Sequence, residues 1–190
     1  MYLFRFITLS WLFLTVCVTA FPIFGFLPPP ILSKRSDSFL YRGTSTEEGK
    51  SVIEGNSVVP KGASHPHGPL TFKTDWETLR HHVLGRLGDN NNRSPFISTT
   101  PSRRIAEGFV AKSEDTREMN GSLLMIDRQG ISEAYSANRE FQKHGQVNPF
   151  GQQMETVIKG EIPSGAIRAV IFYNNGKKTT QQNPNYLYYT

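Results

Sequence analysis

Cysteine is almost absent from this chain of 190 residues, which contains only Cys17. Cys17 lies in an N-terminal apolar run that we expect to be removed, so the mature protein would contain no thiol. This excludes a cysteine nucleophile, a disulfide framework and a zinc site built on cysteine. A secreted domain without disulfides depends on its hydrophobic core, and roughly 155 residues are enough for one such core.

Long hydrophobic runs are also absent. The longest, residues 6–18, has about a dozen residues, whereas a membrane-spanning helix needs about 20. Arg5 precedes it and small residues close it, so residues 1–20 are predicted to be a signal peptide of a secreted, extracellular protein without a transmembrane anchor. Residues 21–35 are rich in proline and end in Lys34 and Arg35, which indicates a pro-segment; the alternative is an N-terminal arm packed on the mature domain, residues 36–190.

The chain also lacks a strong excess of positive or negative charge. The net charge is +5 and the basic residues are scattered, so nucleic acid is permitted as a partner but not indicated. His65 and His67 lie close together in a loop rich in glycine and proline, but no third ligand is near them in the sequence. No metal site is therefore expected.

Apolar residues alternate or cluster in short segments, which predicts one α+β domain, taken to be a monomer, with a mostly antiparallel core. We expect a helix over 75–88 with Asp75 as its N-cap, another from Pro101, and a helix or structured loop over 131–146. Residues 44–68 are expected to be a long loop with one helical turn, and the polar tail from residue 174 is expected to fray. The expected strands are 38–43, 94–100, 122–127, 155–159 and 167–173.

Three segments, 40–43, 96–100 and 148–155, occur in an order and at separations that carry a resemblance. They resemble the R-S-E signature of the mono-ADP-ribosyltransferases of the cholera-toxin, heat-labile-enterotoxin and pertussis-toxin kind. The similarity extends over about residues 39–176, and residues 161–170 resemble the run after the glutamate in the pertussis catalytic subunit. It implies an ADP-ribosyltransferase fold, in which two packed, mostly antiparallel sheets surround an NAD cleft with flanking helices.

Physical chemistry gives the three signature residues roles in NAD+ cleavage. Arg42 offers a planar fork of donors for the pyrophosphate, which a lysine does not match. Departure of nicotinamide leaves an oxocarbenium-like ribose, which Glu155, held by the Ser98 hydroxyl, would stabilise. The plain alternatives are a surface arginine beside a turn and a solvated glutamate at a strand start.

Four further residues are predicted to contact NAD. Ser98 and Thr100 should face the cleft, with Thr99 on the other face of the strand. Tyr41 accompanies the arginine, and His82 resembles a cleft histidine of the pertussis subunit; a histidine on an amphipathic helix otherwise faces solvent.

Gln153 and Phe150 are expected to meet the acceptor. Gln153 stands two residues before Glu155, so both side chains would project to one side if the strand begins there. Relatives that modify arginine have a second glutamate at this place, so the resemblance implies cysteine, asparagine or a nucleobase as acceptor. Phe150 stands where several relatives carry an aromatic that touches the target; the alternative is an inward-packed loop anchor.

The sequence thus predicts a secreted toxin or effector that cleaves NAD+, its substrate, and transfers ADP-ribose to a non-arginine acceptor on an unidentified protein or nucleic acid. Virulence would then require delivery into a target cell, by a separate delivery subunit or another mechanism. Two alternatives stay open at this point: a secreted NAD glycohydrolase, for which water is the acceptor, and a catalytically silent interaction domain of the same fold.

Overall fold

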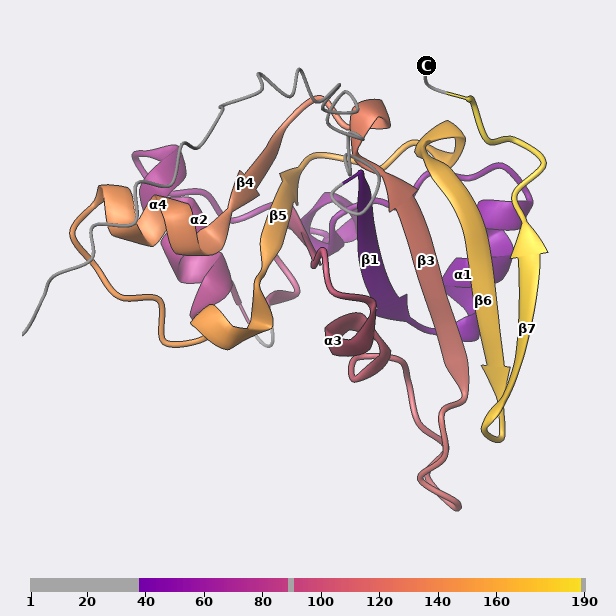
Figure 1. Ribbon diagram of the computed structural model, residues 1–190. Helices are drawn as coiled ribbons and strands as arrows, with labels where there is room; N and C mark the ends of the chain where they lie inside the picture. Colours follow the sequence, from indigo (N-terminus) through magenta and orange to yellow (C-terminus); the bar gives the residue numbers. More distant parts are fainter. Residues whose placement is uncertain (1–37, 89–90, 189–190) are drawn as a thin grey trace, which may run out of the picture. The chain divides into compact units, whose positions relative to one another are not determined.

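Two antiparallel sheets form the framework of the protein in a computed structural model that describes residues 38–88 and 91–188 (Figure 1). The predicted signal peptide and pro-segment lie outside these residues. In spatial order the larger sheet contains β1 (Phe39–Thr44), β3 (Gly121–Asp127), β6 (Ile167–Asn174) and β7 (Lys177–Gln182). The smaller sheet contains β2 (Phe96–Thr99), β5 (Thr156–Lys159) and β4 (Ala134–Ser136).

Short helices cover the sheets. Figure 1 shows α1 behind the larger sheet and α3 in front of it, while α2 and α4 accompany the smaller sheet. The α-helices are α1 (Thr46–Ile53), α2 (Asp75–Val83), α3 (Arg103–Glu107) and α4 (Ala137–Lys143). The 3₁₀ turns are η1 (Lys61–Ser64), η3 (Arg128–Gly130), η4 (Gly151–Gln153) and η5 (Ser164–Ala166).

Alternation along the strands divides the core into three clusters, because successive side chains point to opposite faces of a sheet. The first cluster joins α1 and the inner faces of both sheets, through Val52, Leu40, Leu124, Ile97 and Ile158. The second packs α2 and α4 on the other face of the smaller sheet, through Leu79, Val83, Phe141, Phe96 and Val157. The third packs α3 on the outer face of the larger sheet, through Ala106, Val110, Leu123, Ile171 and Tyr173.

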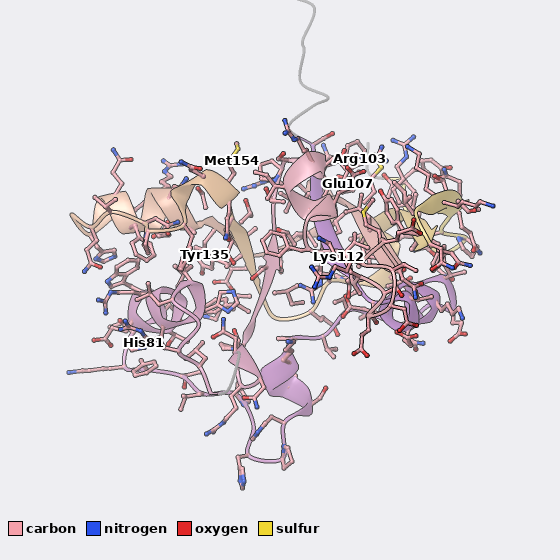
Figure 2. The ribbon with its side chains drawn as sticks, turned by 90° about the horizontal axis from the view of Figure 1, so that it is seen from below. His81, Arg103, Glu107, Lys112, Tyr135 and Met154 are labelled. Carbon is pink, nitrogen blue, oxygen red and sulfur yellow. The ribbon has the colours of Figure 1, made fainter. Side chains whose placement is uncertain are left out.

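The expectation of an α+β fold is confirmed, and every strand pair among the described residues is antiparallel. On the outer face, Arg103 and Glu107 form an ion pair of 3.0 Å within α3 (Figure 2). The buried Tyr173 of β6 donates a hydrogen bond to the same carboxylate at 2.8 Å. Helix α3 is therefore held to the larger sheet by polar as well as apolar contacts.

The predicted helix over 75–88 is shorter in the structure, and Asp75 is not its N-cap. Thr74 caps α2 in a reciprocal capping box with Glu77, so Asp75 is the first helical residue. The helix ends at Val83 because Gly85 takes a φ of 69°, a left-handed conformation that terminates helices.

Two segments contain more regular structure than the sequence predicted. The single helical turn expected near residues 46–50 is a helix of 8 residues, α1, whose N-cap Ser45 accepts from the Glu48 amide. For residues 131–146 the sequence predicted a helix or a structured loop. The segment contains the helix α4, and also the short strand β4, which was not predicted. With only 3 residues, β4 is too short to show an alternating pattern.

The expectation of a fraying tail from residue 174 is wrong. Residues Lys177–Gln182 form β7, which pairs with β6 along its whole length although all its side chains are exposed. The hairpin turn has positive φ at Asn175 (47°) and Gly176 (76°), and an Asn-Gly pair is the typical sequence for such a turn. Beyond β7, the buried amide of Asn183 donates to the carbonyls of Ser164 and Ile167, both at 2.8 Å.

Candidate active site

Strands β1 and β2 meet at one point, where the two sheets join. The Tyr41 amide donates to the Thr100 carbonyl at 2.8 Å, and the Thr100 amide donates to the Tyr41 carbonyl at 2.9 Å. Because this bridge is antiparallel, the chain after Tyr41 runs alongside the residues before Thr100. The arginine and serine segments of the predicted signature, 56 positions apart, are thereby brought side by side.

Arg42 is held in place by two hydrogen bonds. Its Nη1 donates to the Ser98 carbonyl at 3.2 Å, and its Nε donates to Glu48 Oε1 on α1 at 3.0 Å. Among the described residues, Nη2 has no hydrogen-bond partner. Arg42 therefore has its Nη2 group available to donate to a bound ligand.

A cavity of about 570 Å³ opens beside this junction. It brings together every predicted site residue except Phe150. Those residues are Tyr41, Arg42, His82, Ser98, Thr99, Thr100, Gln153 and Glu155. Tyr41 also packs against the core cluster under α3, so part of its ring supports the fold.

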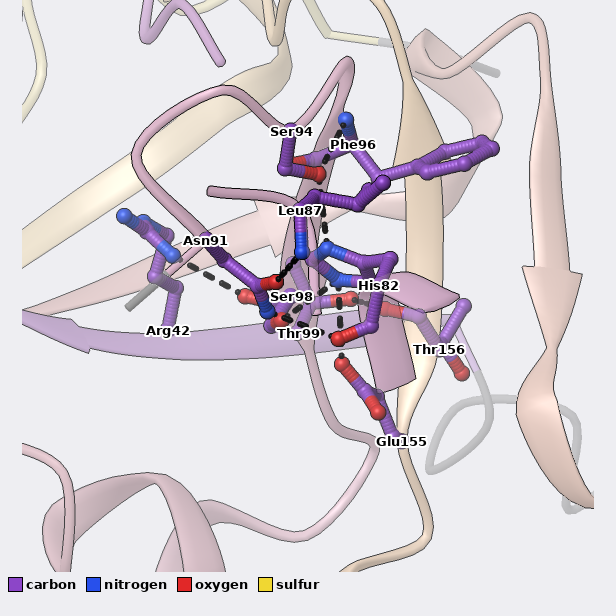
Figure 3. Close-up of polar contacts among 10 residues, drawn as sticks. All are labelled: Arg42, His82, Leu87, Asn91, Ser94, Phe96, Ser98, Thr99, Glu155 and Thr156. Atoms are coloured by element: carbon purple, nitrogen blue, oxygen red, sulfur yellow. Dashed lines mark hydrogen bonds and ion pairs between the residues drawn. The ribbon is translucent and has the colours of Figure 1, made fainter. Parts of the chain in front are cut away.

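His82 lies at the centre of a buried polar cluster (Figure 3). Its Nε2 is 3.0 Å from Ser98 Oγ and 3.4 Å from Glu155 Oε1, and its Nδ1 is 2.7 Å from Ser94 Oγ. The histidine is only 5% exposed, so the alternative of a solvent-facing histidine on an amphipathic helix is wrong. Helix α2 thus contributes a polar side chain to the site from its buried face.

The Glu155 carboxylate is almost buried, and its surroundings favour the ionised form. Burial, the largest influence, raises its pKa, but hydrogen bonds from His82 and Ser98 outweigh it and hold the pKa below the ordinary value of 4.5. The site therefore contains an ionised carboxylate next to the cavity. Such a group can stabilise a positive charge that develops on a ligand.

The hydroxyls of Thr99 and Thr100 both donate to main-chain carbonyls of the protein. Thr99 Oγ1 donates to the Thr156 carbonyl at 2.6 Å, and Thr100 Oγ1 donates to the Gln153 carbonyl at 3.0 Å. Both residues line the cavity, but these bonds tie β2 to β5 and to the turn before it. Of the three hydroxyls on the strand, the one that reaches the polar cluster belongs to Ser98.

Gln153 and Glu155 reach the cavity by a route different from the one expected. Strand β5 begins at Thr156, so the two residues do not share a strand face. Gln153 ends η4, and Met154 has a left-handed backbone with φ 50°. A non-glycine residue in this conformation is uncommon, and here it turns the chain so that both of its neighbours line the same cavity.

Phe150 lies on a second hollow of about 260 Å³. This hollow shares His82, Ser98, Gln153 and Glu155 with the larger cavity. The Phe150 side chain is 42% exposed, so it is not an inward-packed anchor. The polar cluster therefore lies between two openings.

Three residues around the site were missed by the sequence analysis. Glu48 holds Arg42, Ser94 contacts the His82 ring, and the Asn91 amide donates to the His82 carbonyl at 2.7 Å. All three residues also line the cavity. The sequence analysis assigned no site role to Asn91, and no local pattern distinguishes Ser94 from other serines.

Residues 38–88 and 91–188 contain no group of three or more His, Cys, Asp or Glu side chains arranged to hold a metal ion. Within the same residues, none of the helices has both the length and the apolar character needed to cross a bilayer.

The model of a protein family described as "Domain of unknown function (DUF7587)" matches residues 35–175. The chain belongs to this family. A comparison with curated proteins gives no match.

Solved structures show which fold this DUF7587 member adopts. Scabin toxin from Streptomyces scabies in complex with NADH is 16% identical with a TM-score of 0.53, over 80% of this chain and 77% of that chain. A structure described as a guanine-specific ADP-ribosyltransferase is 15% identical with a TM-score of 0.53, over 80% and 79% of the two chains. The predicted ADP-ribosyltransferase fold is confirmed.

Proposed function

We propose that this protein is a mono-ADP-ribosyltransferase of the R-S-E class, which cleaves NAD+ and transfers ADP-ribose to a macromolecular acceptor. The observation that carries the proposal is the convergence of Arg42, Ser98 and Glu155 on one cavity. Its volume of about 570 Å³ lies within the range of about 300 to 1,000 Å³ that is usual for small-molecule sites. The likeness of fold to a structure that contains NADH supports the choice of dinucleotide.

The arrangement suits both the negative pyrophosphate of NAD+ and the positive charge that develops on the ribose during cleavage. The available Nη2 group of the Arg42 guanidinium would donate to the pyrophosphate oxygens. The ionised Glu155 would lie beside the ribose, where positive charge develops as nicotinamide leaves. The acceptor supplies the electron pair for the new bond to the ribose carbon, nicotinamide departs with the pair of the broken bond, and the acceptor loses a proton.

We propose that the acceptor is not arginine, which follows from glutamine at position 153. The side chain of Gln153 offers no negative charge to pair with a guanidinium. The solved structure described as guanine-specific supports a nucleobase as one candidate acceptor, next to a protein side chain. Phe150 and Met154, which are 42% and 50% exposed, flank Gln153 and would contact the incoming target.

The proposal includes secretion, on the basis of the N-terminal sequence, and a role as a toxin. Scabin, whose solved structure has a similar fold, is described as a toxin, which agrees with this role.

The test uses the purified protein and NAD+ labelled in the adenylate part, incubated alone, with a cell lysate and with DNA. Label on protein or on DNA is the expected result, with release of an equal amount of nicotinamide and no label in the Glu155→Gln variant. Release of free ADP-ribose under all conditions would instead assign the protein as an NAD glycohydrolase. A folded protein that neither binds nor cleaves NAD+ would contradict the proposal and favour a silent interaction domain.

The type of acceptor has its own test. Agmatine, a small molecule with a guanidinium group, should not be labelled under conditions in which the macromolecular target is labelled. Efficient labelling of agmatine would contradict the role assigned to Gln153 and leave the fold assignment unaffected.

A further inference from the structure

Ser94 is a buried hydroxyl that the mechanism above does not use. It is 2% exposed and lies just before β2, on the side of the His82 ring that faces away from Glu155. Figure 3 shows Ser94 and Glu155 on opposite sides of the imidazole. A chain of polar contacts therefore runs from Ser94 through His82 to Ser98 and Glu155.

The hydrogen bonds around Ser94 determine where its proton goes. The Phe96 amide donates to Ser94 Oγ at 3.0 Å, so the hydroxyl already acts as an acceptor. Its own proton has two possible acceptors, the His82 Nδ1 at 2.7 Å and the Phe96 carbonyl at 3.4 Å. A separation of 2.7 Å is typical of a good hydrogen bond from a hydroxyl, whereas 3.4 Å is well beyond the usual range. Donation to Nδ1 is the favoured arrangement.

We propose that Ser94 is a positioning residue that fixes the tautomer of His82, so that the ring proton lies on Nε2 and points at Ser98 and Glu155. This inference rests on the proposed function, because it assigns Ser94 a role in the same site. A neutral imidazole has one donor and one acceptor nitrogen, and a donor at Nδ1 leaves the proton on Nε2.

This tautomer orders the rest of the chain of contacts. His82 Nε2 donates to Ser98 Oγ at 3.0 Å, which leaves the Ser98 hydroxyl proton free to bond to the Glu155 carboxylate. In the opposite tautomer, Nε2 would accept the Ser98 proton, and Glu155 would lose that bond. Ser94 therefore acts on Glu155 through two intervening side chains, and its own hydroxyl bonds to the His82 ring and the Phe96 amide.

His82 also has contacts that do not involve Ser94. Its Nε2 lies 3.0 Å from Ser98 Oγ, its main-chain carbonyl accepts from the Asn91 amide at 2.7 Å, and the Phe96 ring lies 5.5 Å from the imidazole. Removal of the Ser94 hydroxyl should therefore change the protonation pattern of the imidazole more than its place. This separates a positioning role from a purely structural one.

The direct test is nitrogen NMR of the His82 ring in the full protein, in mildly alkaline buffer. The wild-type ring should show a protonated Nε2 and an unprotonated Nδ1, and Ser94→Ala should show a mixture of both tautomers. A wild-type ring protonated at Nδ1, or an unchanged spectrum in Ser94→Ala, would overturn the proposal. The spectrum needs no activity, so its outcome is independent of whether the protein cleaves NAD+.

Kinetics give the second readout. Ser94→Ala should lower kcat for NAD+ cleavage about 10-fold with KM nearly unchanged, the loss expected for one hydrogen bond. In a His82→Ala background, the same substitution should have no further effect, because Ser94 acts through His82.

Ser164→Ala is the matched control. Ser164 is also a buried serine, but it bonds to the Val52 carbonyl away from the cavity, and its loss should leave kcat unchanged. Equal losses from Ser94→Ala with and without His82 would refute the proposal.

Discussion

Replacing Glu155 by glutamine removes one negative charge from the site and conserves the shape of the side chain. The carboxylate belongs to a side chain that is 11% exposed, so water screens its charge only weakly. If Glu155 stabilises the ribose cation that forms as nicotinamide leaves, this variant should bind NAD+ and fail to cleave it. The expected defect thus lies in the chemical step and not in substrate binding.

The magnitude follows from the electrostatics of a partly desolvated site. At an effective dielectric constant of about 20, opposite unit charges about 4 Å apart attract by about 4 kcal/mol. Loss of one such preorganised element typically costs about 100- to 1000-fold in kcat. The interaction exists in the transition state and not in the ground state, so kcat and kcat/KM should fall together.

The lowered pKa of Glu155 adds a dependence on pH. Because its hydrogen bonds hold this pKa below 4.5, NAD+ cleavage by the wild-type protein should persist as the pH falls to that value and fail only below it. A carboxyl group whose pKa is lower in the folded state stabilises the protein above its unfolded pKa, and this contribution is lost as the pH falls through the folded pKa. Thermal unfolding of wild type and Glu155→Gln should therefore differ at neutral pH and converge in acid.

The assay is release of nicotinamide from NAD+, measured together with NAD+ binding by calorimetry. Glu161→Gln is the matched control, because Glu161 is an exposed glutamate that follows β5 and lines neither opening of the site. It should retain wild-type cleavage. Survival of cleavage in Glu155→Gln would refute the reasoning, and so would a loss of equal size in Glu161→Gln.

Three further substitutions test separate parts of the site. Gln153→Ala should abolish labelling of the target while hydrolysis of NAD+ by water largely persists; equal loss of both would show that Gln153 acts on the first step. Arg42→Lys should raise KM for NAD+ about 10-fold, because an ammonium lacks the planar set of donors that lets arginine bond to Glu48 and to the pyrophosphate at the same time. An unchanged KM would exclude a role of Arg42 in binding the pyrophosphate. Gly43→Ala places a Cβ 2.3 Å from the Ala106 carbonyl oxygen and should destabilise the protein by about 1 to 3 kcal/mol in urea unfolding; unchanged stability would show that α3 moves freely.

The strands with buried apolar residues were predictable, because burial leaves a pattern in the sequence. β3 is almost wholly buried and β6 buries 5 of its 8 residues, and their apolar runs gave their positions to within one residue. β7 was missed because an exposed edge strand needs no apolar side chains, and its backbone bonds to β6 leave no trace in composition. The Asn-Gly pair before it was the one available signal.

The site shows the same division between local and non-local information. Arg42, Ser98 and Glu155 could be picked out because each belongs to a short motif at the end of a strand. Ser94 and Glu48 could not, because their partners are assigned only when α2 and α1 pack on the sheets. A serine or a glutamate has many possible partners, and only the tertiary structure selects one.

The site depends on strand register as much as on residue type. Ser98 lies opposite Val157 in the pairing of β2 with β5, which brings its hydroxyl near the residue that precedes β5, Glu155. A slip of one residue would turn Ser98 to the other face of the sheet and separate it from His82. The bonds that Thr99 and Thr100 make across this pairing oppose such a slip. These two threonines were predicted to bind NAD, and their hydroxyls also keep the serine and the carboxylate in register.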